Sequence, residues 1–405
     1  MSENVKIVAQ LSSVHSTDDV LDTGNVARYL DSVGKSIQLD ILIAGWQERP
    51  DLYRMLTSPD SRQSSEVFLW YPVLSDYPGF DPSHLVVDNH SRRSRGWDGY
   101  DGTGIAETFK QSCPNNPDTL LAALGYLEKC MTEYAFDGVF LDKIRFPSAA
   151  NGLQDVFSCF CPHCMEKAAK SGLDLCEVRA ILGGTHDIRT QGRFAKIPPG
   201  APWLELLVAD QPLLQQFIRF RADSISEMIA TVADRMRNLG KKVSLDVFSP
   251  VLAPLVGQDF EALTHHAEWI KPMIYRFGRG PSSLRSELPA LIHELGDHLG
   301  LDEVQTMKWV ANHVDGVAGY SLEELEEVAP LSLIRAETRS ALSCFGGTPL
   351  YLGLETVSIE GVKEITPRNV EEILEIGSDI GVQGYVLSWD LLHTPIENLK
   401  PLMAL

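Results

Sequence analysis

Stretches of apolar residues with the length of a β-strand recur along the chain, and segments with the periodicity of an α-helix separate them. Near-continuous apolar runs of this kind are typical of parallel strands that are covered on both faces. Eight runs fit this description: 5–11, 37–45, 66–74, 137–142, 242–248, 269–275, 349–356 and 381–390. Eight strands that alternate with helices predict a (β/α)₈ TIM barrel. A doubly wound sheet is the alternative, but no Gly-rich phosphate loop follows the first run.

Three of the intervening segments have clear helical patterns. They are 116–135, 210–240, which ends at a glycine suited to a C-cap, and 366–381, which begins with a Thr N-cap. Two connections are unusually long for a barrel, namely 147–210 after the fourth strand and 276–348 between the sixth and seventh strands. We expect one catalytic barrel domain over 1–405, with the first connection as an inserted loop and the second as a helical insertion.

Polar and aromatic residues stand at or just beyond the carboxyl ends of the predicted strands, where TIM barrels build their active sites. Carboxylates occur on four of the last five strands, which favours a functional rim over isolated strand caps. The candidate catalytic residues are Asp142, Asp246, Glu355 and Asp390. The candidate substrate-binding residues are Trp46, Glu48, Tyr71, Arg145, Tyr275 and Trp389. A structural alternative for Asp142 is an ion pair with Arg145.

Composition narrows the class of partner. Apolar residues make up 44% and charged residues 22% of the 405 residues, as in ordinary globular proteins. The formal net charge of −20 repels phosphate backbones and anionic headgroups, so we expect neither nucleic acid nor a membrane surface as partner. The N-terminal residues show no basic region followed by an apolar run, and no transmembrane-length segment is apparent, which predicts a cytoplasmic protein.

Three of the seven cysteines lie within six residues, in the sequence CFCPHC. Cys159, Cys161 and Cys164 have metal-ligand spacing, and a structural zinc site requires a fourth donor. His163, Cys176 and Cys113 are the candidates for it. Surface thiols and a redox pair in CPHC are the alternatives. The two other cysteines, Cys130 and Cys344, are expected to be buried apolar residues.

The segments SCPNNP and CFCPHC together resemble the four-cysteine zinc loop of a family of microbial β-galactosidases built on TIM barrels. FDGVFLDKIRFPS, EVFLWYPVL, WIKPMIY and GVQGYVLSWD resemble glycosidase-like TIM-barrel families. This resemblance implies a structural zinc ion held by Cys113, Cys159, Cys161 and Cys164. It also implies glycosidase or transglycosidase activity on a glycosidic bond of an oligosaccharide or small glycoside.

The resemblance bears on the catalytic residues as well. The β-galactosidase-type families have an Asn-Glu pair at the end of the fourth strand, where this sequence has Asp142 and Lys143. Glu355 matches the position of their nucleophile at the end of the seventh strand. Asp142 matches the Asp nucleophile of barrels that act on α-linked sugars. Because adjacent residues of a strand face opposite ways, we expect Lys143 to point away from Asp142, and Arg145 to turn back from beyond the strand.

Glycoside hydrolysis generally requires two carboxyl groups, one ionised and one protonated. We expect Asp142 to be the nucleophile or stabilising carboxylate, and Glu355, Asp246 or Asp390 to be the acid. A non-catalytic carbohydrate-binding barrel and a metal-dependent barrel hydrolase are the alternatives, although the histidines form no ligand pattern at strand ends. A homo-oligomer is possible, since the zinc loop offers a contact surface.

Overall fold

A computed structural model describes residues 5–12, 21–60, 65–99, 107–183, 211–359 and 363–405. It contains all eight predicted strands. They are β1 (Lys6–Ser12), β2 (Ile41–Gly45), β3 (Glu66–Pro72), β4 (Gly138–Asp142), β5 (Lys242–Phe248), β6 (Ile270–Met273), β7 (Tyr351–Glu355) and β8 (Gly384–Ser388). Each of them lies within, or overlaps by all but one residue, the apolar run that predicted it.

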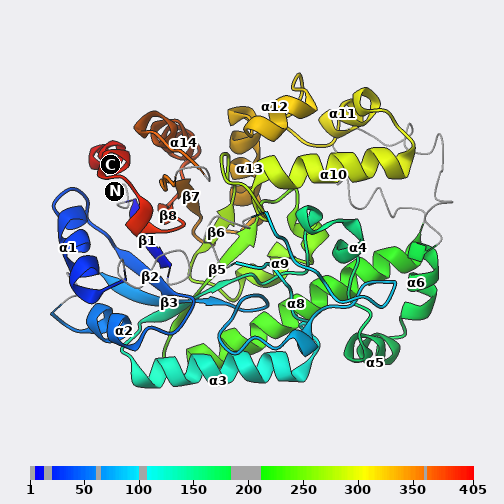
Figure 1. Cartoon of the computed structure of the whole chain (residues 1–405), viewed down its shortest axis with the longest axis horizontal. Helices are drawn as coiled ribbons and strands as arrows, with labels where there is room; N and C mark the ends of the chain where they lie inside the picture. The colour runs from blue at the N-terminus through cyan, green and yellow to red at the C-terminus, as the bar shows by residue number, and fades with distance from the viewer. Residues whose placement is uncertain (1–4, 13–20, 61–64, 100–106, 184–210, 360–362) are drawn as a thin grey trace.

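The strands form one parallel sheet in the order β6-β5-β4-β3-β2-β1-β8-β7. A parallel bridge between Ile270 and Leu350 joins the two outer strands, so the sheet closes on itself. Closure confirms the TIM barrel and excludes the doubly wound sheet, which would leave two open edges. Figure 1 shows the strands at the centre of the molecule with helices around them.

The helices surround the barrel and include the three that the sequence predicts, α3, α8 and α14. The α-helices are α1 (Thr23–Gly34), α2 (Pro50–Thr57), α3 (Pro117–Glu133), α4 (Leu153–Val156), α5 (Pro162–Lys170), α6 (Leu175–Gly183), α8 (Pro212–Asn238), α9 (Phe260–Thr264), α10 (Leu284–Leu299), α11 (Glu303–Ala311), α12 (Leu322–Glu327), α13 (Leu331–Cys344), α14 (Pro367–Ile380) and α15 (Ile396–Leu399). Short 3₁₀ turns are η1 (Pro82–His84), η2 (Ala149–Asn151), η5 (Ala253–Val256), η6 (Leu391–His393) and η7 (Lys400–Ala404). Thr366 caps α14 as expected, accepting a hydrogen bond from the backbone N–H of Asn369.

Both predicted insertions are present. Helices α4, α5 and α6 follow β4, and helices α10 to α13 stand between β6 and β7, gathered on one side of the barrel (Figure 1). The remainder of the first insertion, with the sequence IPPGAPW, lies outside the described residues. No helix within the described ranges combines the length and the apolar character that a membrane crossing requires.

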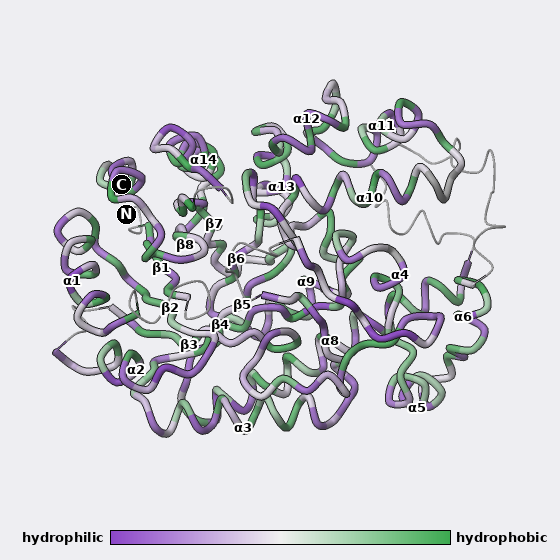
Figure 2. The backbone as a smooth tube through the Cα atoms, viewed as in Figure 1, coloured by the Kyte–Doolittle hydropathy of each residue, from purple (hydrophilic) through white to green (hydrophobic). Residues whose placement is uncertain are grey.

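Two apolar layers result from the alternation of side chains along the strands. One face of each strand packs against the helices, whose hydrophobic and hydrophilic residues alternate, as along α3 in Figure 2. The other face fills the barrel. This inner layer contains Val8, Ile41, Ile43, Trp46, Phe68, Trp70, Phe140, Trp269, Tyr351 and Val386. Large aromatic rings therefore form much of the packing inside the barrel.

Candidate functional site

Strand alternation brings polar side chains into the barrel above the apolar layer. Phe140 points inward, so Asp142, two residues on, points inward as well. Leu141 pairs with Leu245, which sets Asp142 and Asp246 side by side on neighbouring strands. Asp246 in turn pairs in register with Lys271 of β6. Two carboxyl groups and an ammonium group therefore meet at the carboxyl ends of β4, β5 and β6.

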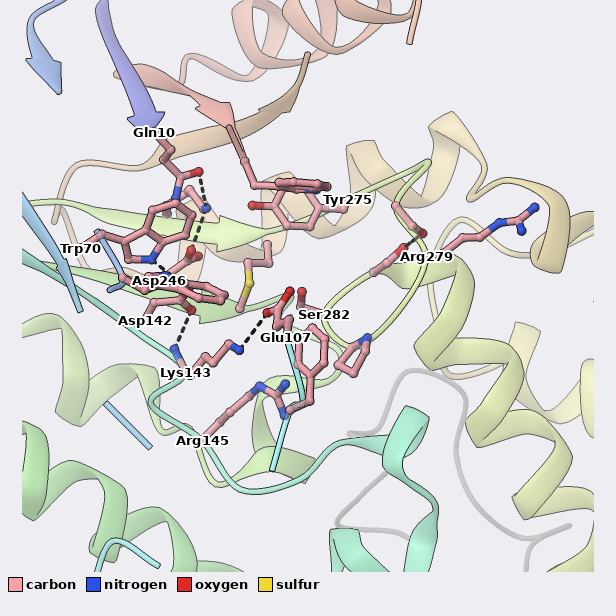
Figure 3. Close-up of a pocket in the computed structure, with 18 of the residues that line it drawn as sticks. Gln10, Trp70, Glu107, Asp142, Lys143, Arg145, Asp246, Tyr275, Arg279 and Ser282 are labelled. Atoms are coloured by element: carbon pink, nitrogen blue, oxygen red, sulfur yellow. Dashed lines mark hydrogen bonds and ion pairs between the residues drawn. The ribbon is translucent and has the colours of Figure 1, made fainter. Parts of the chain in front are cut away.

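A cavity of about 640 Å³, counted out to its open mouth, lies over these side chains. Six of the predicted site residues line it, namely Trp46, Asp142, Arg145, Asp246, Tyr275 and Trp389. Figure 3 shows Asp142, Asp246 and Tyr275 around the same space, with Arg145 approaching from the loop after β4. Glu48, Tyr71, Glu355 and Asp390 are not among the residues that line it.

Asp142 is held by two N–H donors. The indole Nε1 of Trp70 donates to its Oδ2 over 3.0 Å, and the backbone N–H of Lys143 donates to its Oδ1. The residue is only 5% exposed, and that exposure is toward the cavity. N–H groups can only donate, so this environment suits an oriented carboxylate that presents its remaining lone pairs to a ligand.

Lys143 also lines the cavity, contrary to the expectation that it faces away from Asp142. Its φ of 51° ends the strand and turns the side chain back over the rim. The ammonium group lies 2.8 Å from Glu107 Oε1, is paired with Asp76, and stands 4.2 Å from the ring centroid of Trp46. Lys143 thus joins the loop after β3 to the loop after β4. Burial raises the pKa of Asp76, but the charge of Lys143 and the hydrogen bonds to the carboxylate outweigh burial and lower the pKa to about 2.

Asp246 and Lys271 form a buried ion pair, with 2.7 Å between Oδ2 and Nζ. Lys271 Nζ also donates to Oε1 of Gln10 over 3.3 Å, while Oδ1 of Asp246 has no hydrogen-bond partner among the described residues. Desolvation raises the pKa of Asp246 well above its ordinary value; Lys271 opposes this rise and Asp142 adds to it. The carboxylates in turn raise the pKa of Lys271.

Glu355 has a different environment from the two aspartates. It accepts hydrogen bonds from the backbone N–H groups of Arg276 (2.6 Å), Phe277 (3.0 Å) and Gly278 (2.8 Å). Lys363 Nζ lies 2.7 Å from its Oε1. Both oxygens are therefore occupied by the loop that follows β6, and we interpret Glu355 as the residue that fixes this loop.

We expect Glu355→Gln to lower the free energy of unfolding by about 2–4 kcal/mol, because it breaks a buried ion pair and replaces one acceptor oxygen by a donor. Any turnover that the cavity supports should remain within about tenfold of wild type, because Glu355 does not line the cavity. Urea unfolding and steady-state kinetics measure the two effects. The control is Glu371→Gln, whose side chain is 48% exposed. Full stability with a loss of turnover as large as for Asp142→Asn would instead make Glu355 catalytic.

The other three residues outside the cavity have structural contacts. Asp390 is fully buried, accepts from the backbone N–H groups of Ser12 and Leu392 at 3.3 Å, and pairs with His393 at 2.8 Å. Glu48 pairs with Lys129 of α3 at 2.9 Å. The ring of Tyr71 stacks on Tyr126, with 5.5 Å between centroids. These contacts hold helices and loops to the barrel.

Several lining residues were missed by the sequence analysis. Gln10 and Lys271 could have been recognised in the sequence, since each is a polar residue within an otherwise apolar strand, at an inward position. Trp70 resembled an ordinary core residue. Glu107 and Lys363 come from loops, where no periodicity indicates which way a side chain points.

Comparison with solved structures shows the same barrel fold in other proteins. No family model matches the sequence, and no curated protein matches it. Among solved structures, the PgaB (BpsB) glycoside hydrolase domain from Bordetella bronchiseptica superposes over 96% of this chain and 95% of its own, with a TM-score of 0.57 and 13% identity. The catalytic domain of beta-amylase from Paenibacillus polymyxa covers 100% of this chain and 98% of its own, with a TM-score of 0.52 and 10% identity. The chain shares the barrel fold of these two domains.

The four cysteines of the predicted metal site form a second cluster, away from the cavity. Cys113 precedes α3, and the other three lie at the start of α5, yet all four are buried and their sulfur atoms lie within 4.8 Å of one another. Sγ of Cys113 is 3.4 Å from that of Cys164 and 3.5 Å from that of Cys161. Four ligands at about 2.3 Å from a tetrahedral ion stand roughly 3.8 Å apart, so the cluster fits a metal ion.

The surroundings of the sulfur atoms suit thiolates. Backbone N–H groups of Val87 and Cys161 point at Cys159 Sγ over 3.3 and 3.4 Å, and Nδ2 of Asn115 points at Cys164 Sγ over 3.3 Å. Cys113 therefore supplies the fourth position, while His163 and Cys176 are exposed and outside the cluster. Cys130 is buried as expected, whereas Cys344 is exposed, because it lies at the solvent side of the last turn of α13.

Proposed function

We propose that this protein is a glycosidase that hydrolyses an O-glycosidic bond with Asp142 and Asp246 as its carboxyl pair. The observation that carries the proposal is that both side chains project into one cavity from adjacent strands, in unlike environments. Asp142 receives two N–H donors, whereas burial raises the pKa of Asp246. Two carboxyl groups held in different protonation states are what acid-assisted glycoside cleavage requires. The fold shared with the PgaB glycoside hydrolase domain and beta-amylase supports this assignment.

The two aspartates have separate roles in this reaction. Asp246 acts in its protonated form, in which Oδ2 stays in contact with Lys271 and Oδ1, an oxygen with no hydrogen-bond partner among the described residues, carries the proton. Oδ1 donates this proton to the glycosidic oxygen, so the leaving sugar departs as an alcohol. The bond between that oxygen and the anomeric carbon breaks, and Asp142 faces the positive charge that develops there. A water molecule supplies hydroxyl to the anomeric carbon, and its second proton restores the acid.

Aromatic rings would position the sugar. Trp46, Tyr275 and Trp389 line the cavity, and flat apolar faces of this kind stack on the C–H faces of sugar rings. Trp46 meets Trp70 edge-on, with centroids 5.2 Å apart, so both indoles are held in fixed orientations. Trp70 also donates to Asp142, which links the aromatic wall to the reacting carboxylate.

The raised pKa of Asp246 predicts a pH dependence. Because the acid acts only when protonated, kcat/KM should fall as pH rises through this pKa, giving the basic limb of the profile. Asp246→Asn should remove this limb and lower kcat/KM on an alkyl glycoside about 10²- to 10⁴-fold. For a 2,4-dinitrophenyl glycoside, whose leaving group needs no proton, the decrease in kcat/KM caused by Asp246→Asn should be much smaller. A basic limb that persists unchanged in Asp246→Asn would contradict the role given to this residue.

Turnover separates this proposal from a non-catalytic carbohydrate-binding barrel. The test incubates the protein with a broad panel of oligosaccharides and aryl glycosides and detects new reducing ends. We expect at least one member to be cleaved, and binding without any cleavage would favour the alternative. A metal-dependent hydrolase is less well supported, because the described residues contain one group with metal-ligand geometry, the cysteine cluster, and it is a closed set of four thiols.

We further propose that the metal held by the cysteine cluster is zinc. Four thiolates in tetrahedral reach are the usual ligands of structural zinc, and they leave no position for a substrate or water. The ion would join the loop before α3 to the insertion that follows β4. It would stabilise the wall of the active site and take no part in bond cleavage.

A further inference from the structure

The buried cations of the cavity differ in one respect, namely whether a carboxylate neutralises them. Lys143 pairs with Glu107 at 2.8 Å, Lys271 with Asp246 at 2.7 Å, and Lys363 with Glu355 at 2.7 Å. Arg145 is 1% exposed and lines the same cavity, yet within the described ranges its guanidinium group forms no ion pair. A buried charge without a counterion is costly, so it calls for an explanation.

The hydrogen bonds of Arg145 are equally incomplete. Of its five N–H donors, one makes a hydrogen bond with a described residue, from Nη1 to the backbone carbonyl of Phe146 over 3.1 Å. Its carbon Cζ lies 4.6 Å from the ring centroid of Phe248, which supports one face of the planar group. The edge of the guanidinium is thereby left to the cavity, and Figure 3 shows Arg145 extending toward the side where Glu107 and Ser282 stand.

The carboxylate with the strongest electrostatic effect on Arg145, that of Glu287, forms no ion pair with it among the described residues. Glu287 is fully buried, and its oxygens accept from Ser148 Oγ (2.6 Å) and from the backbone N–H groups of Ser282 (2.8 Å) and Ala150 (3.0 Å). Burial lowers the pKa of Arg145, although Glu287 and, more weakly, Asp142, Glu107 and Asp76 attract its charge through space without contacting it. Arg221 provides a contrast, since this equally buried arginine donates to two backbone carbonyls, at 3.0 and 2.7 Å, and does not line the cavity.

We infer that Arg145 is the recognition site for an anionic group on the sugar, so that the substrate class is an acidic glycoside. A carboxylate or a phosphate ester presents paired oxygens that match the guanidinium fork and would supply both the missing charge and the missing acceptors. The net charge of −20 repels anions at long range, but salt screens that repulsion beyond about 8 Å. Inside the cavity, the nearby guanidinium of Arg145 therefore dominates the interaction with an anion. The inference that the ligand is a glycoside rests on the proposed function. The inference that Arg145 binds an anionic group does not depend on catalysis.

The test is direct binding by isothermal titration calorimetry, which requires no hydrolysis. The probes are the methyl glycosides of glucose, galactose and mannose, each as neutral sugar, as hexuronate and as 6-phosphate. We expect an anionic member of at least one series to bind about 10- to 100-fold more tightly than its neutral counterpart. The hexuronate and phosphate arms distinguish the two sources of negative charge.

Arg145→Gln should abolish this preference, and Arg145→Lys should restore part of it, because a lysine keeps the charge without the fork. Arg368→Gln, which removes one charge at a side chain that is 64% exposed, is the matched control and should leave the preference unchanged. Circular dichroism establishes that the variants fold. If Arg145→Gln does not fold, the comparison of neutral and anionic sugars on the wild-type protein still tests whether the cavity prefers anions. Equal binding of neutral and anionic sugars, no binding of any anionic sugar at 10 mM, or a preference that survives in Arg145→Gln would overturn the inference. Cleavage of neutral glycosides with no anionic preference would overturn it while leaving the proposed function intact.

Discussion

Asp142→Asn is expected to lower kcat on the true glycoside substrate at least about 10³-fold, because the amide cannot carry the negative charge that the developing cation requires. The fold should survive, since the side-chain amide has nearly the same shape and its oxygen still accepts from Trp70 or from the backbone of Lys143. Steady-state kinetics and thermal unfolding of the same preparation measure the two quantities.

Asp51→Asn is the control for this substitution, since that side chain is 91% exposed and lies outside the cavity. It should change neither kcat nor stability appreciably. Full turnover by Asp142→Asn would remove Asp142 from the catalytic pair. A collapse of stability together with activity would mean that its main role is to hold Trp70 and the strand end.

The second large effect concerns the cysteine cluster. Cys159→Ser should remove the proposed zinc ion and destabilise the insertion that carries α5 and α6 by at least about 3 kcal/mol, since the metal would tie this insertion to the loop before α3. Metal content by mass spectrometry and limited proteolysis of residues 149–183 follow the two consequences. Because the metal would take no part in bond cleavage, kcat should decrease only to the extent that the loops at the rim become disordered.

Cys176→Ser provides the matched control, because Cys176 is exposed and lies in the same insertion outside the cluster. Zinc content and resistance to proteolysis should stay at the wild-type level in this variant. Native protein that is free of metal and has four reactive cluster thiols would contradict the zinc assignment. Unchanged stability of Cys159→Ser would show that the cluster does not hold the insertion in place.

The barrel was predictable because strand periodicity is local and strong. Each apolar run in the sequence became a strand, and the helical segments before β4, β5 and β8 formed as expected. The pairing of Cys113 with CFCPHC, by contrast, came through resemblance, since spacing alone left His163 and Cys176 open. Both of these alternatives are exposed in the structure.

The candidate site was predictable in part. Position at a strand end correctly brought Asp142 and Asp246 to the rim, but the same rule also selected Glu355 and Asp390. Those two carboxylates accept backbone N–H groups from loops that lie far away in the sequence, and such contacts have no sequence pattern. Lys143 escaped prediction because a residue with positive φ ends the alternation of the strand.

The most direct test of the central claim is hydrolysis in water enriched with oxygen-18. Cleavage between the anomeric carbon and the glycosidic oxygen places the solvent oxygen on the new reducing end, and mass spectrometry detects it as a gain of about 2 Da. We predict that the wild-type protein produces labelled reducing ends from at least one glycoside of the panel and that Asp142→Asn produces almost none. Unlabelled reducing ends, or equal labelling by wild type and Asp142→Asn, would contradict a glycosidase that works through this carboxyl pair.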